Sequence, residues 1–239
     1  MKQLFLLLIL LFILQGCKKA PIAANSSQPM LQTKEKSGTA LKTDTLYFSY
    51  PSDDKPQDDF AIIKLMDEKF TKDSMCTSKF RIEFIQKKRI LFSDWITIKG
   101  IVKGSEWYGS NEMDSINSPY KRLSFGYPAC GYSQDNYLYY IEGSSSSKVH
   151  TWLSVGDGGW FNDVAFFPLS TTTFACRTAS FWPEEVAPEN QETDEEFGIL
   201  EHSDSIVFSL QNNTWHKSFK TPKGKVYRKK RMSYDSIIN

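Results

Sequence analysis

The sequence is short of the residues that build metal and catalytic centres. It has only four cysteines and three histidines among 239 residues, and no Cys-x-x-Cys pair or cysteine–histidine spacing of a zinc site. It also lacks the Gly-x-Ser-x-Gly, His-Glu-x-x-His and Gly-x-x-x-x-Gly-Lys patterns of hydrolases, metalloproteases and nucleotide-binding loops. We therefore predict no metal, no cofactor and no catalytic residue, although a site assembled from distant residues stays open.

An excess of charge of one sign is also missing. Lysine and arginine number 29 against 28 aspartates and glutamates, so nothing in the overall charge indicates a nucleic-acid partner. No motif recurs at a fixed period, which gives no support to a repeat fold such as a propeller. With 40% hydrophobic and 24% charged residues the composition is that of a globular protein.

Uninterrupted apolar sequence is concentrated at the N-terminus. Residues 4–14 form an apolar run of eleven residues behind Lys2. A membrane-spanning helix needs about 20 residues, so this run is too short for one. A basic start followed by a short apolar run is typical of a secretory signal peptide, which is removed and takes no part in the fold.

The segment Leu14-Gln15-Gly16-Cys17 follows the apolar run directly. It resembles the lipobox of bacterial lipoproteins, in which the cysteine is lipidated and becomes the mature N-terminus. Gln15 stands where that family usually holds a smaller or less polar residue. The resemblance implies a palmitate-type membrane anchor on Cys17. Because Lys18 replaces the aspartate that retains some lipoproteins in the inner membrane, it also implies the outer membrane, facing the periplasm. The alternative is an ordinary signal peptide with an incidental cysteine.

Three regions follow from these patterns. Residues 1–16 are the expected signal peptide, and residues 17–43 are the lipidated cysteine and a flexible tether rich in Lys, Ser, Thr, Ala and Pro. Residues 44–239 are expected to form a single β-rich domain.

Short β-branched and aromatic runs, separated by Gly, Pro, Asn, Asp and Ser, fill the domain. Aromatic residues make up 14% of the chain. This texture predicts an all-β fold, an antiparallel β-sandwich or barrel of roughly ten to twelve short strands. The expected strands are residues 45–50, 60–66, 80–86, 90–98, 101–103, 122–127, 137–142, 149–155, 164–169, 173–177, 206–210, 214–219 and 226–231, with one short helix at 67–75.

Three cysteines remain after the signal segment, namely Cys76, Cys130 and Cys176. An oxidising periplasm permits one disulfide between them. Cys130 and Cys176 each lie in an aromatic, turn-flanked segment, so we favour a disulfide between these two. The alternative is three buried, reduced thiols.

A tripeptide of Asp, then Ser or Thr, then an apolar residue occurs five times. It resembles the O-glycosylation acceptor of one group of Gram-negative bacteria. The alternative is local turn chemistry before a strand. The acceptor residues that the resemblance implies are Thr45, Ser74, Ser115, Ser205 and Ser236.

The segment at residues 156–163 is rich in Gly and Asp. It could hold Ca²⁺, but the EF-hand spacing is absent, and a hairpin turn explains Asp-Gly and Gly-Gly better. Aromatic and glycine-rich residues nearby form the expected ligand surface on a β scaffold. Its candidate residues are Tyr127, Tyr132, Trp152, Asp157 and Trp160.

Two charge blocks lie late in the chain. Residues 184–204 are acidic and residues 217–231 are basic. We expect a solvated loop and a solvated hairpin that could lie against each other. The functional alternative is that the basic block contacts anionic lipid headgroups, surface polysaccharide or a partner.

These features favour a non-catalytic envelope lipoprotein that binds a protein or glycan partner near the outer membrane. One alternative is a glycan-active hydrolase with two paired carboxylates. Another is a structural or assembly factor without a small ligand. The carboxylates available for hydrolysis are Glu106, Asp135, Glu142, Asp157 and Asp163.

Overall fold

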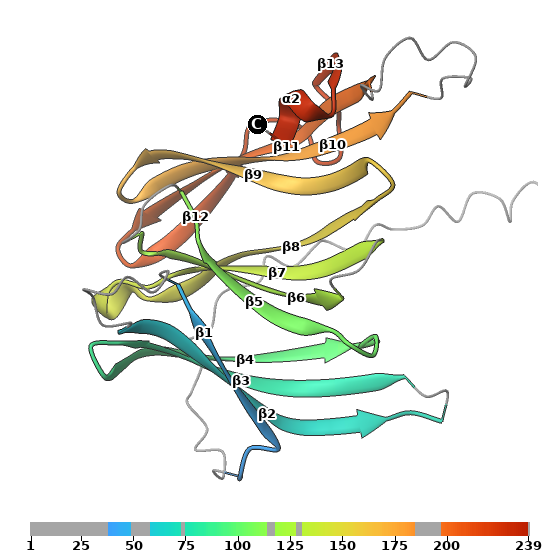
Figure 1. Cartoon of the computed structure of the whole chain (residues 1–239). Coiled ribbons are helices and arrows are strands. Elements are labelled where there is room, and N and C mark those ends of the chain that lie inside the picture. The colour runs from blue at the N-terminus through green and yellow to red at the C-terminus, as the bar shows by residue number, and fades with distance from the viewer. Residues whose placement is uncertain are drawn as a thin grey trace, which may run out of the picture. The chain divides into compact units, whose positions relative to one another are not determined.

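The computed structural model describes residues 38–48, 58–72, 75–113, 118–127, 131–184 and 197–238. Strands dominate these residues, so the prediction of an all-β fold is confirmed (Figure 1). The elements are β1 (Lys42–Tyr47), β2 (Asp59–Phe70), β3 (Cys76–Gln86), β4 (Arg89–Lys99), β5 (Glu106–Asn111), β6 (Tyr120–Tyr127), β7 (Tyr132–Tyr140), η1 (Gly143–Ser145), β8 (Ser147–Asp157), β9 (Trp160–Ser170), β10 (Thr173–Pro183), β11 (Phe197–Gln211), β12 (Thr214–Phe219), β13 (Arg228–Ser233) and α2 (Asp235–Ile238).

The strands form two antiparallel sheets. The first has four strands in the order β1-β2-β3-β4, and the second has nine, in the order β12-β11-β10-β9-β8-β7-β6-β5 with β13 also on β11. Apart from β13, neighbours in space are neighbours in sequence, as short hairpin connections require. The long strand β11 carries β12 on residues 206–211 and β13 on residues 197–202 of the same edge.

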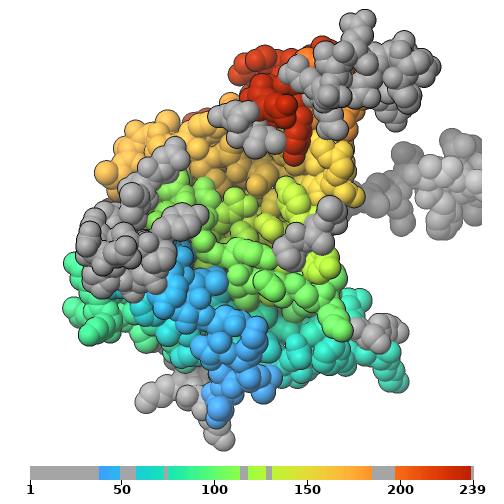
Figure 2. Space-filling model, viewed as in Figure 1, coloured from blue at the N-terminus to red at the C-terminus, as the bar shows by residue number. Residues whose placement is uncertain are grey.

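The nine-stranded sheet curls, so the described residues lie in three layers. Strands β5–β8 lie between β1–β4 and β9–β13, as Figure 1 shows, and the layers lie directly against one another in Figure 2. Side chains alternate across a strand. Tyr139 of β7 therefore packs on Phe84 of the four-stranded sheet, with ring centroids 4.7 Å apart. Leu138 and Tyr140 belong to the second core.

The second core contains aromatic rings from both halves of the curled sheet. The Tyr120 ring of β6 lies 5.3 Å from Phe174 of β10, and Phe174 stacks on Phe208 of β11 at 4.8 Å. Leu138 and Tyr139 are each 0% exposed although they are adjacent in sequence, so β7 is buried on both faces.

Buried polar bonds tie the first two layers together. Tyr139 donates its hydroxyl hydrogen to Asp94 of β4 at 2.8 Å. Lys121 is 3% exposed, and its ammonium contacts Asp59 of β2 at 2.5 Å and donates to Asn111 at 2.7 Å. A buried charge is tolerated only with such partners. The Tyr139–Asp94 and Lys121–Asp59 contacts therefore join the two sheets.

Several expected elements differ from the structure. The helix at residues 67–75 is wrong, because β2 continues to Phe70, where Phe70 pairs with Cys76 of β3. Residues 101–103 form no strand, whereas β5 was not expected. The tether was expected to end at residue 43, but β1 begins at Lys42, so the last two residues of the expected tether belong to a strand. Residues 1–37 lie outside the described part.

The basic block is not the hairpin that the sequence predicted. Strands β12 and β13 each pair with β11 and not with each other. Of the acidic block, residues 197–204 belong to β11, and residues 185–196 lie outside the described part. The two blocks do lie against each other, since Lys229 pairs with Glu201 at 2.5 Å and Arg231 with Glu184 at 2.8 Å.

Two of the three remaining cysteines lie within the described residues. Cys76 and Cys176 carry free, buried thiols. Burial raises the pKa of the Cys176 thiol to about 12, which keeps it protonated and unreactive at neutral pH. Cys130 lies outside the described residues, so its pairing with Cys176 stays a prediction. Within the described residues, no helix is long and apolar enough to cross a membrane.

His150 of β8 faces the second core. Its ring stacks on Trp152 at 5.6 Å and lies 5.2 Å from Phe208. Burial, and then the nearby Lys217 charge, lower the pKa of His150 to about 4. The folded state therefore binds this proton more weakly than the unfolded chain does.

The sign of this shift predicts acid sensitivity. The contribution of neutral His150 is complete above about pH 6.5 and is lost as the pH falls toward 4. At pH 5 the loss is about 2 kcal/mol. His150→Phe keeps the ring and removes the proton site, so its free energy of unfolding should fall less between pH 7 and pH 5 by that amount in urea titrations. The exposed His216→Phe control should behave like wild type, and an equal fall for both variants would contradict the prediction.

Candidate functional site

Two tryptophans stack on one face of the third layer, where Trp182 is exposed and Trp160 is half-buried. Trp160 begins β9 and Trp182 lies near the end of β10. Pairing of Phe161 with Phe181 sets the two strands in register, and the indole rings stack with centroids 5.7 Å apart and planes at 6°. Trp182 is 47% exposed. A stacked tryptophan pair with one ring half exposed to solvent is a large contact surface with little conformational freedom.

The register extends this pair into a row across four strands. Trp182 pairs with Ile199 of β11, and Ile199 pairs with Arg231 of β13. Two residues along each strand a second row follows on the same face. We call these eight residues the platform: Trp160, Trp182, Ile199 and Arg231 in the first row, and Asn162, Ser180, Glu201 and Lys229 in the second.

Polar contacts hold the platform side chains in place. Asn162 donates its amide hydrogen to the Ser180 hydroxyl at 2.7 Å. Arg231 donates from Nε and Nη2 to the Glu184 carboxylate at 2.9 and 2.8 Å, and its guanidinium lies 4.4 Å above the Phe197 ring. This two-pronged bond orients the planar group. Arg231 remains an exposed, pre-oriented donor beside the aromatic pair.

The residues predicted as a ligand surface are only partly brought together. The strand pairing places Tyr132 opposite Gly156 and Asp157 opposite Trp160, at one end of the sheet, with Tyr127 opposite Ser133 at the same end. Gly158 and Gly159, with φ of 51° and 84°, form the turn between β8 and β9. Positive φ at both central positions is the type I′ hairpin geometry that the turn alternative requires.

Trp152 lies away from that group, between the layers. Its indole Nε1 donates to Asp163 at 2.8 Å, and its ring packs on Phe166 at 5.1 Å. The Arg122 guanidinium lies 5.0 Å from the Trp152 ring. Trp152 is therefore a packing residue of the second core, whereas Trp160 belongs to the surface.

A closed polar network surrounds Arg122 in this core. Arg122 donates from Nη2 to the Asn136 carbonyl oxygen at 2.8 Å, and Ser124 donates to the same oxygen at 2.6 Å. Asn136, 1% exposed, donates in turn to Ser154 at 2.7 Å. Arg122 also contacts Asp163 at 3.4 Å. Because each buried member has a partner, the network specifies packing and holds Asp163 in an ion pair.

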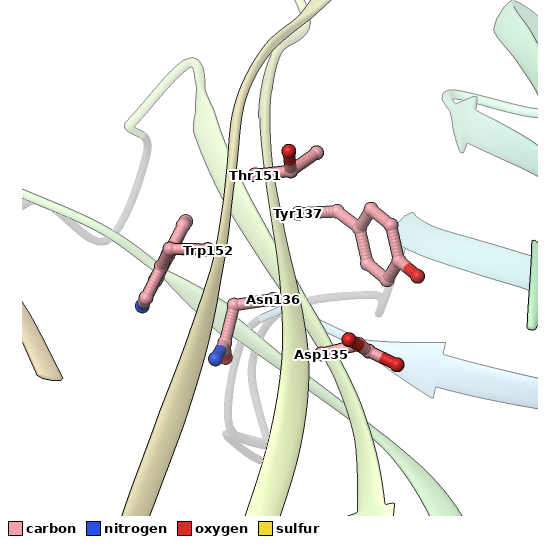
Figure 3. Close-up of a pocket in the computed structure, with 5 residues that line it drawn as sticks. All are labelled: Asp135, Asn136, Tyr137, Thr151 and Trp152. Atoms are coloured by element: carbon pink, nitrogen blue, oxygen red, sulfur yellow. The ribbon is translucent and has the colours of Figure 1, made fainter. Parts of the chain in front are cut away.

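A hollow of about 220 Å³ lies on β7 and β8. Figure 3 shows Asp135, Tyr137 and Thr151 pointing to one side of these strands, and Asn136 and Trp152 to the other. Burial raises the pKa of Asp135. Pockets that hold small molecules occupy roughly 300–1,000 Å³, so this hollow is small for such a ligand.

The carboxylates considered for hydrolysis have separate surroundings. Glu142 accepts the Tyr140 hydroxyl hydrogen, and Asp163 is held by Arg122 and Trp152. Glu106 and Asp157 are exposed at strand ends. Among the described residues, no group of three or more His, Cys, Asp and Glu side chains is placed to hold a metal ion.

The five predicted glycosylation acceptors have different surroundings. Thr45 of β1 and Ser236 of α2 are exposed, and Ser205 is half-buried beside a bulge in β11. Ser74 and Ser115 lie outside the described residues. Modification at any of them stays a prediction.

Comparison with known proteins gives no relative: no family model, no curated protein and no solved structure matches the chain. Sequence reasoning singled out Trp160, and included Arg231 only as part of the basic block, but it missed Trp182 and Ile199. The Phe181-Trp182-Pro183 segment carried the only local signal, an aromatic pair at a strand end.

The stacked pair predicts a measurable coupling. Aromatic pairs contribute about 0.5–1.5 kcal/mol beyond their buried area in double-mutant cycles. Trp160→Ala and Trp182→Ala should therefore show an interaction free energy of about 1 kcal/mol in urea unfolding. The same cycle between Trp160 and Trp95, which lie on different sheets, should be additive. Additivity in both cycles would show that the stack does not form.

Proposed function

We propose that the protein is a non-catalytic binding module of the cell envelope that engages a protein partner through the platform. The observation that carries this proposal is the row in which a stacked tryptophan pair continues into Ile199 and Arg231. Trp182 and Arg231 are exposed in this row, and Trp160 and Ile199 are half-buried. Tryptophan, tyrosine and arginine dominate the binding energy of protein interfaces. An apolar patch with a polar rim is typical of an interaction surface.

The arrangement of charges supports a protein partner. The first row of the platform is aromatic and aliphatic up to Arg231, while the ion pairs Arg231–Glu184 and Lys229–Glu201 lie at its β13 end. Protein interfaces have this anatomy, with charged residues depleted at the centre and polar groups at the rim. Side chains held before binding lose less entropy when the complex forms.

The alternatives have weaker support. A hollow of about 220 Å³ is small for a ligand-binding or catalytic cleft. Of the carboxylates that a hydrolase could use, Asp163 and Glu142 are engaged in hydrogen bonds within the protein. A flat aromatic face suits a macromolecule better than a small molecule.

Crosslinking from the platform tests this proposal. A photoreactive phenylalanine analogue in place of Trp182, in the full chain expressed in its own cells, should give a discrete adduct with one protein. The same analogue at Val102, exposed outside the platform, is the matched control and should give none. Arg231→Glu should remove the adduct, because it reverses the charge beside Trp182 and breaks the bond to Glu184.

Two outcomes would overturn a protein partner. One is an equal adduct from positions 182 and 102. The other is binding of purified envelope polysaccharide by wild type but not by Trp182→Ala, which would assign the platform to a glycan.

The location in the envelope is a separate part of the proposal. It rests on the Leu14-Gln15-Gly16-Cys17 segment, which lies outside the described residues. Lipid on this cysteine would hold the platform near a membrane, which we propose is the outer membrane. More than one acyl chain is needed for stable anchoring, and lipobox cysteines carry several.

Cys17→Ala tests the anchor. Wild type expressed with radiolabelled palmitate should incorporate label and sediment with membranes. The variant should incorporate none and accumulate as precursor or soluble protein, because its acceptor thiol is gone. Cys130→Ala controls for lipid on another cysteine, and label retained in Cys17→Ala would refute the lipobox assignment.

A further inference from the structure

The opposite face of the platform strands carries a second group of side chains. Along a strand, alternate residues point to opposite faces. Arg177 and Ala179 of β10 therefore face away from the platform, and Ala179 pairs with His202 of β11. His202 pairs with Arg228 of β13. The register thus brings Arg177, His202 and Arg228 onto one face of three neighbouring strands.

Two nitrogens of this group are buried and have no partner. His202 is 6% exposed, and its Nδ1 makes no hydrogen bond. The Nε of Arg177 is also buried and unpartnered, while the guanidinium stacks on Phe167 at 4.6 Å. Buried polar groups are nearly always satisfied, so each exception needs an explanation. Here two basic side chains on neighbouring strands each have a buried nitrogen without a hydrogen-bond partner.

The charge on this face is also uncompensated. On the platform face, the β13 cations Lys229 and Arg231 pair with Glu201 and Glu184. On the opposite face, Arg177, Arg228 and Lys230 make no ion pair within the described residues. Burial, and then the Arg177 and Arg228 charges, lower the pKa of His202. The group is therefore a concentration of positive charge.

The backbone around His202 is firmly held. The Asp204 carboxylate accepts from Gly224 N–H at 2.7 Å and from Ser203 at 3.3 Å, which fastens the loop before β13. That loop leads to Tyr227, whose N–H donates to the His202 carbonyl at 3.0 Å. The Tyr227 ring lies 6.4 Å from the His202 ring. Donors on paired strands are placed more accurately than donors on a loop.

We propose that Arg177, His202 and Arg228 form a binding site for a tetrahedral oxyanion, a sulfate or phosphate that is free or carried as an ester. The anion would accept from the unpartnered Arg177 Nε and His202 Nδ1 and balance the Arg228 charge. Arginine recognises such oxygens through several donors at once. This site lies on the face opposite the platform and does not depend on the platform's partner.

Titration calorimetry with sodium sulfate tests the site, using the full chain in neutral detergent. Sulfate should bind with a stoichiometry of one. Arg177→Gln and Arg228→Gln should each weaken binding by roughly tenfold or more, because each removes a charged donor. Lys229→Gln, one residue from Arg228 but on the platform face, is the matched control for charge and should bind like wild type. Arg228 is exposed, so its variant tests the site even if Arg177→Gln fails to fold.

Sulfate keeps its charge between about pH 7.5 and pH 5.5, so any pH effect reports the protein. Binding should tighten toward about pH 5.5, where the anion favours protonated His202, and His202→Gln should remove this dependence. The charged groups that face His202 are Arg177 on β10 and Arg228 and Lys230 on β13, with Asp163 in the same row on β9 and Asp204 at the bulge.

Competition experiments distinguish a lipid phosphate from a free anion as the natural ligand. Displacement of sulfate by phosphatidylglycerol vesicles, but not by phosphatidylcholine vesicles, would assign a lipid phosphate; displacement by inorganic phosphate alone would assign a free anion. Two outcomes would overturn the proposal. If sulfate does not bind, the site does not exist. If Lys229→Gln weakens sulfate binding as much as Arg228→Gln does, the binding reflects general surface charge.

Discussion

Burial of strand β7 on both faces is the constraint on which the rest of the structure depends. Tyr139 packs into the four-stranded sheet, while Leu138 and Tyr140 pack under β9–β12. A strand with two buried faces has no free side for polar groups. Asn136 is therefore accommodated only because Arg122, Ser124 and Ser154 complete its hydrogen bonds. An unpaired amide at this depth would be strongly destabilising.

Because the middle layer is occupied by packing, both surfaces that we propose for binding lie on the outer strands. The β10 and β13 segments beyond the second core have one face with the platform and one with the Arg177, His202 and Arg228 group. Because side chains alternate along β13, the basic residues at 228–231 are divided between the two faces. Lys229 and Arg231 meet carboxylates, whereas Arg228 and Lys230 do not, so one basic run contributes to two surfaces of different chemistry.

The sequence was sufficient to predict the fold class, because alternating and aromatic runs between turn residues report strands directly. It could not give the site. Trp160 was recognisable beside a Gly-Gly turn, but its partner Trp182 depends on the β9–β10 register, which a shift between Thr173 and Phe174 sets. Ile199 and Arg231 join the row only through the long-range pairing of β11 with β13. His150 carried no signal of burial, since it lies in a strand whose two faces both bear mixed residues.

The bulge in β11 decides which side chains meet. Cys176 pairs with Ile206 but Thr178 with Ser203, so β11 has one extra residue there, and Asp204 takes a φ of 47°. A one-residue slip moves every following side chain to the other face. Without the extra residue, His202 would share a face with Trp182, and Glu201 would face Arg177. The bulge thus places Glu201 and its partner Lys229 on the platform face, and His202 on the face of Arg177.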